Sequence, residues 1–251
     1  MTQAGPIDRI EAYRRARTAV VERIDAACRR AGRDPAGITL VAVSKTVEAE
    51  ALRDAVTAGL DLLGENRVQE AAAKVPLVPG ARWHLVGPLQ SNKARRALEL
   101  FDVIESVDSV ELAERLDRLA REVVPGTRYP ILLQVNVDVD PAKAGLDPAG
   151  LEASVARIVD LDALEVRGLM TIGRLASDSE TARATFRALR QLSTGLRGVG
   201  LPIGPALSMG MTDDFEIAVE EGSTIVRVGR ALFGERHGHD HAHDQDHVQA
   251  H

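Results

Sequence analysis

The sequence has little cysteine, few aromatic residues and no long apolar run. Its single cysteine, Cys28, cannot form an internal disulfide, so no oxidising compartment is required. Aromatic residues make up 3% of the chain and acidic residues outnumber basic ones by 37 to 31, which argues against a surface built to bind nucleic acid. No apolar run reaches the roughly 20 residues that cross a bilayer, and the N-terminus lacks the apolar stretch of a secretory signal. We therefore expect a cytoplasmic globular protein with no nucleic-acid or membrane partner.

Short apolar runs recur along the chain and are separated in most places by helical stretches. Runs without clean polar alternation are typical of strands buried on both faces, as in a parallel sheet. Eight such runs within one chain predict a single (β/α)8 barrel of the TIM type, in the α/β class. The predicted strands are residues 39–44, 60–63, 83–86, 103–106, 131–137, 166–172, 206–209 and 224–228, and helices are predicted at 48–58, 110–124 and 181–196.

The two ends of the chain lie outside this repeat. Apolar residues three or four apart from Ile7 to Ala31 predict one extra helix before the barrel. Residues 237–251 hold six of the seven histidines and no apolar pattern, so we expect a barrel domain at 1–236 and a disordered tail. The tail either binds transition metals loosely or is simply solvated. An open doubly wound sheet is the alternative fold, but no Gly-x-Gly-x-x-Gly follows the first predicted strand.

Polar residues follow the predicted strands, and Lys45 is the most distinctive of them. In a barrel of this type the reactive groups lie at the C-terminal ends of the strands. Lys45 directly follows the first apolar run. There, partial desolvation lowers the pKa of an amine and allows it to form a Schiff base with an aldehyde. The alternative is a lysine that only extends from the strand end into water.

The last two strands end in serine and glycine. Ser208 lies near the end of the seventh predicted strand, Gly210 follows that strand, and Gly229 follows the eighth. Barrels often bind phosphate at these loops through backbone N–H groups, although the glycines are equally explained by tight turns. The acidic residues Asp213 and Asp214 are expected in the first turn of a helix. Together with Lys45, these ends suggest a site for an aldehyde that carries a phosphate.

Arg227 and His84 interrupt apolar runs. Alternation places Arg227 on the face opposite to Val226 and Val228, so its guanidinium should face the barrel interior. A buried guanidinium requires an acceptor, and a structural carboxylate such as Glu65 would serve as well as a ligand. His84 is interpreted as a core histidine that supports the site from behind.

Six ordered segments of the sequence resemble the pyridoxal phosphate homeostasis protein family, a family of barrels related to the N-terminal domain of alanine racemase. The similarity extends from Ile7 to Arg236 in colinear order. The segments are residues 40–46 (LVAVSKT), 64–66 (GEN), 83–93 (WHLVGPLQSNK), 167–170 (RGLM), 207–214 (LSMGMTDD) and 222–229 (GSTIVRVG).

The resemblance implies a pyridoxal 5'-phosphate site. By it, Lys45 would hold the cofactor as an internal aldimine and Asn66 would contact it. Ser208 and Gly229 would lie at the phosphate, and Arg227 near the pyridine nitrogen. The implied protein is a monomeric carrier that contributes to cofactor homeostasis, serves apo-enzymes that depend on the cofactor, and has neither catalytic turnover nor a metal site in the barrel.

Two enzymatic alternatives remain. An amino-acid racemase of this barrel class uses two opposed bases, the cofactor lysine and a tyrosine from a C-terminal β domain. We expect that domain to be absent, because 22 residues follow Gly229, and both tyrosines, Tyr13 and Tyr129, are expected far from the barrel mouth. A phosphosugar lyase that forms a Schiff base on Lys45 is the other alternative.

Overall fold

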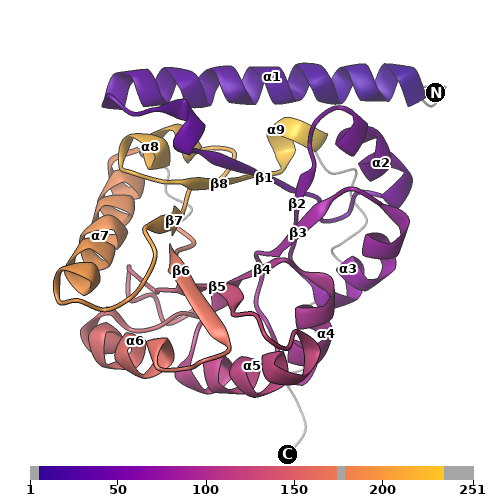
Figure 1. Cartoon of the computed structure of the whole chain (residues 1–251). Helices are drawn as coiled ribbons and strands as arrows, with labels where there is room; N and C mark the ends of the chain where they lie inside the picture. The colour runs from indigo at the N-terminus through magenta and orange to yellow at the C-terminus, as the bar shows by residue number, and fades with distance from the viewer. Residues whose placement is uncertain (1–5, 174–178, 235–251) are drawn as a thin grey trace, which may run out of the picture.

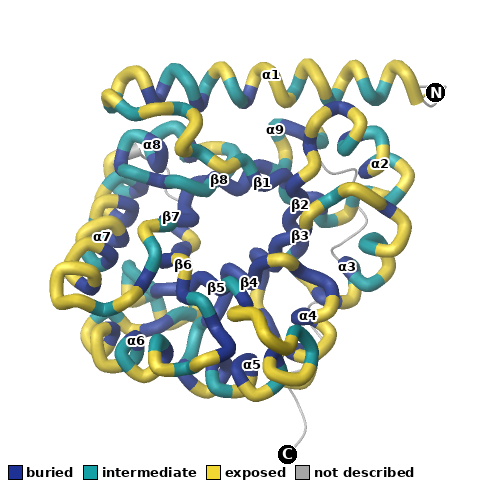
Figure 2. Tube along the Cα trace, in the orientation of Figure 1, coloured by how far each residue is buried: buried dark blue, intermediate teal, exposed yellow. Residues whose placement is uncertain are grey.

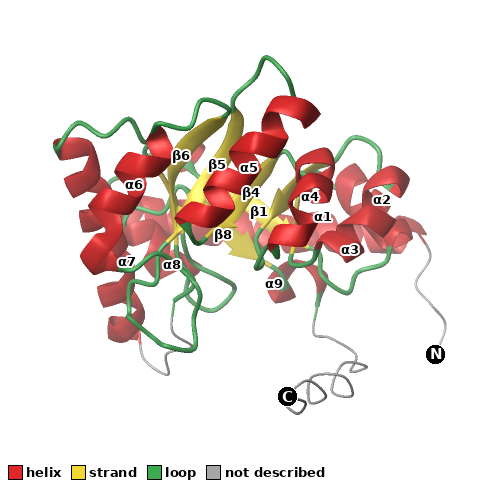
Figure 3. Ribbon diagram, turned by 90° about the horizontal axis from the view of Figure 1, so that it is seen from below, coloured by secondary structure: helices red, strands yellow, loops and turns green. Residues whose placement is uncertain are grey.

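The protein is a closed barrel of eight parallel strands surrounded by helices, as predicted. The computed structural model describes residues 6–173 and 179–234. Figure 1 looks into the barrel, with the helices in a ring around the strands, and Figure 3 shows the same arrangement from the side. The predicted tail at 237–251 lies outside the described residues.

Strands and helices alternate along the described chain. The strands are β1 Thr39–Val43, β2 Leu62–Glu65, β3 Arg82–Leu85, β4 Val103–Val107, β5 Tyr129–Gln134, β6 Leu164–Met170, β7 Ala206–Ser208 and β8 Ile225–Val228. The helices are α1 Pro6–Ala31, α2 Ala49–Thr57, α3 Val68–Lys74, α4 Ala94–Leu100, α5 Val110–Val123, α6 Leu151–Val159, α7 Ser179–Gly198, α8 Phe215–Glu220 and α9 Arg230–Phe233. Among these helices, none is both long and apolar enough to span a membrane.

The barrel closes where the first strand pairs with the last. Val41 of β1 lies opposite Arg227 of β8, and Val43 of β1 lies opposite Gly64 of β2 on the other side. Closure leaves no strand edge unpaired. The residues that follow β1, β2 and β8 therefore lie side by side at the C-terminal rim.

Several predicted boundaries differ from the observed ones by one to three residues, because apolar composition does not mark where ladder hydrogen bonds begin and end. The second strand was predicted at 60–63 and is observed at Leu62–Glu65, so it includes the charged Glu65. A helix does start beside Asp213 and Asp214, but the expectation that they lie in its first turn was wrong, because Asp214 is the N-cap residue. Helix α8 begins only at Phe215, and the carboxylate of Asp214 instead accepts a hydrogen bond from the backbone N–H of Met211 at 2.6 Å.

The extra helix α1 crosses the outside of the barrel, as Figure 1 shows. Val20, Ile24 and Cys28 are buried on its inner face. Tyr13 packs edge-to-face on Phe233 of α9, with ring centroids 5.5 Å apart. Because Cys28 is buried, its thiol is part of the core. The contact between Tyr13 and Phe233 holds the short helix α9 against the rim.

The barrel has two packed layers that differ in chemistry. The layer between strands and helices is apolar, and Figure 2 shows the buried band that runs around the strands. The interior contains a small apolar cluster of Val41, Leu62 and Val86. It also contains the buried polar side chains of Glu105 and Arg227. Buried polar groups need partners, so the interior chemistry is concentrated around these side chains.

Gly168 of β6 generates a prediction about stability. Its φ is +152°, and a Cβ added there would lie 1.9 Å from the carbonyl oxygen of Ala206 on β7. Gly168→Ala should therefore lower the free energy of unfolding by more than about 1 kcal/mol, which thermal denaturation would measure. Gly195 in α7 has open space around its Cα, so Gly195→Ala should stabilise the protein by up to about 1 kcal/mol. Equal melting temperatures for Gly168→Ala and the unmodified protein would contradict the close approach of β6 and β7.

Candidate functional site

Lys45 lies at the C-terminal rim, in a tight turn directly after β1. The backbone N–H of Ser44 donates to the carbonyl of Gly64 at 2.8 Å, and the N–H of Val47 returns to the carbonyl of Ser44 at 3.0 Å. Thr46 has a φ of +67°, in the left-handed region. For a β-branched residue this conformation costs about 1–3 kcal/mol and persists only where surrounding contacts enforce it. The turn thus holds a half-buried Lys45 in a fixed place.

A buried ionic cluster fixes this turn from outside the barrel. The carboxylate oxygen Oε1 of Glu65 accepts hydrogen bonds from Ser44 Oγ and Lys74 Nζ, both at 2.7 Å. Lys74 Nζ also donates to the carbonyl of Ser44 at 2.9 Å. Burial raises the pKa of Glu65, and the hydrogen bond and charge of Lys74 partly offset that rise.

Glu65 is not the partner of Arg227, which corrects one of the two interpretations of that arginine. The preceding residue, Gly64, faces the interior, because an added Cβ there would lie 2.7 Å from Cγ1 of Val41. Side chains alternate along a strand, so Glu65 faces outward towards Lys74 of α3. Lys74 was missed at the level of sequence, because nothing local links it to Glu65.

Asn66 follows β2 on the same rim and is half-buried. The loop after β3 lies directly against its backbone, since a Cβ added to Gly87 would lie 2.4 Å from the Asn66 carbonyl oxygen. A glycine is therefore needed at position 87, and Asn66 is confined between this loop and the Lys45 turn.

Arg227 faces the barrel interior, as predicted, and is 5% exposed. Its guanidinium donates from NH1 to Ser208 Oγ and from NH2 to the carbonyl of Thr171 at 2.8 Å. Oε2 of Glu105 lies 3.9 Å from NH1. Burial lowers the pKa of Arg227, whereas the charges of Glu105 and Asp214 raise it. The guanidinium remains charged at neutral pH.

Glu105 is the buried acceptor that sequence reasoning missed. Its Oε2 accepts from Ser208 Oγ at 2.5 Å, and its Oε1 lies 2.5 Å from His84 Nδ1. Burial alone would raise the pKa of Glu105, but the hydrogen bond and charge of His84, together with Arg227, bring it below its ordinary value. His84 is thus a buried core histidine, as expected, and it contacts Glu105. The signal was present in the sequence, because Glu105 interrupts an apolar run as Arg227 does.

Gly210 and Gly229 lie in the loops after β7 and β8. Gly210 has a φ of +93°, and an added Cβ would lie 2.5 Å from that of Ala218, so the close approach of α8 requires glycine. Gly229 precedes α9, and an added Cβ would lie 3.3 Å from the carbonyl oxygen of Val43. In α9 the backbone N–H groups of Leu232 and Phe233 donate to the carbonyl of Gly229, so only those of Arg230 and Ala231 lack an acceptor within the helix. The start of α9 lies beside the strand end that carries Lys45.

The structure thus brings the five predicted residues to one end of the barrel. The set combines an amine, a charged guanidinium, an amide and the N–H groups at a helix start. Such donors suit a ligand that carries a carbonyl and an anionic group, which is the chemistry of pyridoxal phosphate. In the described ranges, no group of three or more metal-ligating side chains is found. The predicted residues are Lys45, Asn66, Ser208, Arg227 and Gly229.

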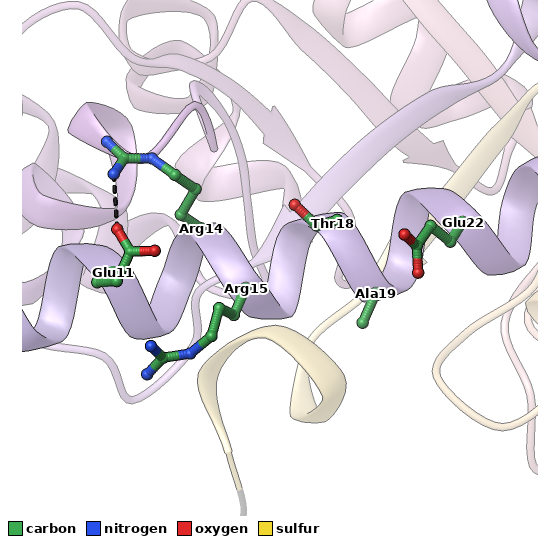
Figure 4. Close-up of a pocket in the computed structure, with 6 residues that line it drawn as sticks. All are labelled: Glu11, Arg14, Arg15, Thr18, Ala19 and Glu22. Carbon is green, nitrogen blue, oxygen red and sulfur yellow. Dashed lines mark hydrogen bonds and ion pairs between the residues drawn. The ribbon is translucent and has the colours of Figure 1, made fainter.

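A depression elsewhere on the surface does not share this chemistry. A hollow of about 290 Å³ lies on α1. Figure 4 shows its lining residues, among them Glu11, which accepts a hydrogen bond from Arg14. All of its lining residues come from one helix. It lies on the outer helix and not at the strand ends, so it is separate from the candidate site.

Comparisons with known proteins agree with this geometry. Residues 17–237 match the family "Alanine racemase, N-terminal domain". The pyridoxal phosphate homeostasis protein of Escherichia coli K12 is 41% identical over 225 residues, which cover 86% of this chain and 94% of the relative. The structure of PipY from Synechococcus elongatus with PLP bound is 44% identical, with a TM-score of 0.75, and the match covers 86% of this chain and 100% of PipY. A structure from Bifidobacterium adolescentis, described as an unknown protein, is 38% identical, with a TM-score of 0.83 and coverage of 90% and 96%. The chain belongs to the pyridoxal phosphate homeostasis protein family, within the wider group of alanine racemase N-terminal domains.

Proposed function

We propose that this protein binds pyridoxal 5'-phosphate covalently through Lys45 and contributes to control of the free cofactor level. The observation that carries the proposal is the position of Lys45, held in a strained turn beside the start of α9. An amine and the start of a short helix then follow two neighbouring strands, β1 and β8, at one rim. The relative PipY, whose structure was solved with PLP bound, supports the same ligand class.

Each residue of the rim has a separate part in this proposal. When bound, the cofactor supplies two reactive features. One is an aldehyde, which condenses with amines, and the other is an electron-poor ring. Lys45 would provide the nucleophilic nitrogen, and Asn66 would help to hold the cofactor from the β2 side. Gly229, which precedes α9, would help to hold its phosphate. Arg227 would hold the ring nitrogen and disfavour its protonation, because the guanidinium charge is permanent.

Ser208 serves this site mainly through Arg227. Its hydroxyl hydrogen is donated to Glu105, and its oxygen accepts from Arg227. A serine hydroxyl has one hydrogen. To donate a hydrogen bond to the phosphate, the Ser208 hydroxyl would therefore have to give up its hydrogen bond to Glu105.

We infer a binding role without turnover, in a monomeric cytoplasmic protein that serves apo-enzymes dependent on the cofactor. An arginine at the ring nitrogen makes the ring a weaker electron sink than a carboxylate would. The two tyrosines also have other contacts. Tyr13 packs on Phe233, and Tyr129 begins β5 and donates its hydroxyl hydrogen to the carbonyl of Phe101. Neither is placed to act as the second base of a racemase.

The first prediction concerns the covalent anchor. Lys45→Ala should abolish the borohydride-reducible attachment of pyridoxal phosphate, and it should leave the melting temperature of the ligand-free protein nearly unchanged because Lys45 is not a core residue. Absorbance spectra before and after reduction, followed by peptide mapping over the four lysines of the chain, would measure this. Lys93→Ala is the matched control and should retain the attachment. Reducible cofactor on another lysine of the Lys45→Ala variant would overturn the assignment, and a reducible adduct formed with a phosphosugar would favour the lyase.

The second prediction concerns turnover. The protein loaded with pyridoxal phosphate should show negligible racemisation of L-alanine, because each positioned base contributes roughly 10²- to 10⁴-fold to such a reaction and one is missing. Circular dichroism or chiral chromatography of the amino acid would follow the reaction, with an alanine racemase as the positive control. A turnover number above about 1 s⁻¹ would contradict the binding role.

A further inference from the structure

We propose that Glu105 is a positioning residue that fixes the guanidinium of Arg227 for the cofactor ring. The inference rests on the proposed function and extends it to a residue that does not itself reach the rim loops. Glu105 lies on β4 and Arg227 on β8, so the two side chains meet across the barrel interior. Both are buried.

The contacts form a chain with Ser208 in the middle. Ser208 donates to Oε2 of Glu105 at 2.5 Å and accepts from NH1 of Arg227. The other oxygen of Glu105 is held by His84 at 2.5 Å. Each oxygen of the carboxylate therefore has one partner, and its orientation is fixed from two sides.

The guanidinium is anchored at a second point, directly after β6. Its NH2 group donates to the carbonyl of Thr171 at 2.8 Å. A planar guanidinium held at NH1 and NH2 cannot rotate about its long axis, so the direction of its remaining N–H groups is set. Glu105 also balances the buried charge of Arg227, although their separation of 3.9 Å makes the link through Ser208 the main directional contact.

This arrangement predicts that substitutions at Glu105 act through Arg227. Removal of the carboxylate charge leaves the buried guanidinium with less compensating negative charge, with Asp214 as the remaining carboxylate that acts on it, and this is unfavourable for a buried cation. Arg227 should then leave Thr171 and turn towards solvent at the rim. The cofactor would lose a donor held in a fixed position, although no residue that contacts the cofactor would be substituted.

A double-mutant cycle tests this coupling. Pyridoxal phosphate is titrated into the ligand-free protein, and the dissociation constant is obtained from the absorbance change. Glu105→Gln keeps the shape of the side chain and removes its charge, and it should weaken binding by about tenfold, the size expected for one hydrogen bond from a charged group. In the Arg227→Gln background the same substitution should change binding by less than about twofold, since Arg227 is no longer there to be positioned. Equal losses in both backgrounds, or no loss in either, would overturn the positioning role.

Glu221→Gln is the matched control. Glu221 is also a buried glutamate paired with arginines, among them Arg183 at 3.0 Å, but it follows α8 away from the rim. Its substitution should lower the melting temperature and leave the dissociation constant and the absorbance band of the bound cofactor unchanged. An equal effect of Glu221→Gln on binding would show that general destabilisation explains the result for Glu105, and it would overturn the proposal.

The crystal structure of the ligand-free Glu105→Gln variant gives a readout that does not depend on the cofactor. The guanidinium of Arg227 should be displaced from the Thr171 carbonyl, and an unmoved guanidinium would overturn the proposal. If the Glu105→Gln variant does not fold, Ser208→Ala removes the same bridge between Glu105 and Arg227. The Ser208→Ala variant then takes its place in the binding titration and in the crystal structure. A displaced Arg227 in the variant, together with no cofactor uptake by the unmodified protein, would sustain the fixing of Arg227 by Glu105. The same result would overturn the proposed function.

Discussion

The burial of one positive charge inside the barrel is the constraint on which the candidate site depends. A guanidinium cannot lose its proton at neutral pH, so Arg227 must find acceptors wherever the fold places it. It finds the carbonyl of Thr171 and the hydroxyl of Ser208, backed by the carboxylate of Glu105. These partners lie on β4 and β7 and directly after β6, so one side chain of β8 links strands on several sides of the barrel.

A second buried charge pair supports the neighbouring part of the rim, after β1 and β2. Lys74 and Glu65 meet outside the barrel, behind β1 and β2, and both bond to Ser44. The next residue is Lys45, and Thr46 is held at positive φ. The candidate anchor and the candidate ring partner are thus each fixed by a buried carboxylate. One carboxylate faces the helices and the other faces the interior, so the two pairs hold the rim independently.

The two clusters differ in how completely the carboxylates are satisfied. Both oxygens of Glu105 have a partner, and its pKa lies below the ordinary value. Glu65 is bonded through Oε1, whereas its Oε2 has no hydrogen-bond partner within the described residues. Burial raises the pKa of Glu65 despite its contact with Lys74. The carboxylate of Glu105 is therefore the better anchored of the two. This agrees with its proposed role, which is to hold Arg227 in one orientation.

The sequence by itself determined the fold class, the extra N-terminal helix, the place of Lys45 after the first strand and the inward direction of Arg227. These follow from local rules, because the period of apolar residues sets the type of element and alternation sets the side of a strand. The same rules point Glu65 outward, once the observed strand places Gly64 inside. Only the tertiary structure decided that Glu105 and Ser208 serve Arg227 and that Lys74 serves Glu65. Charged partners attract one another irrespective of their separation in sequence, so the pairs exist only after barrel closure and helix packing bring distant strands and helices together.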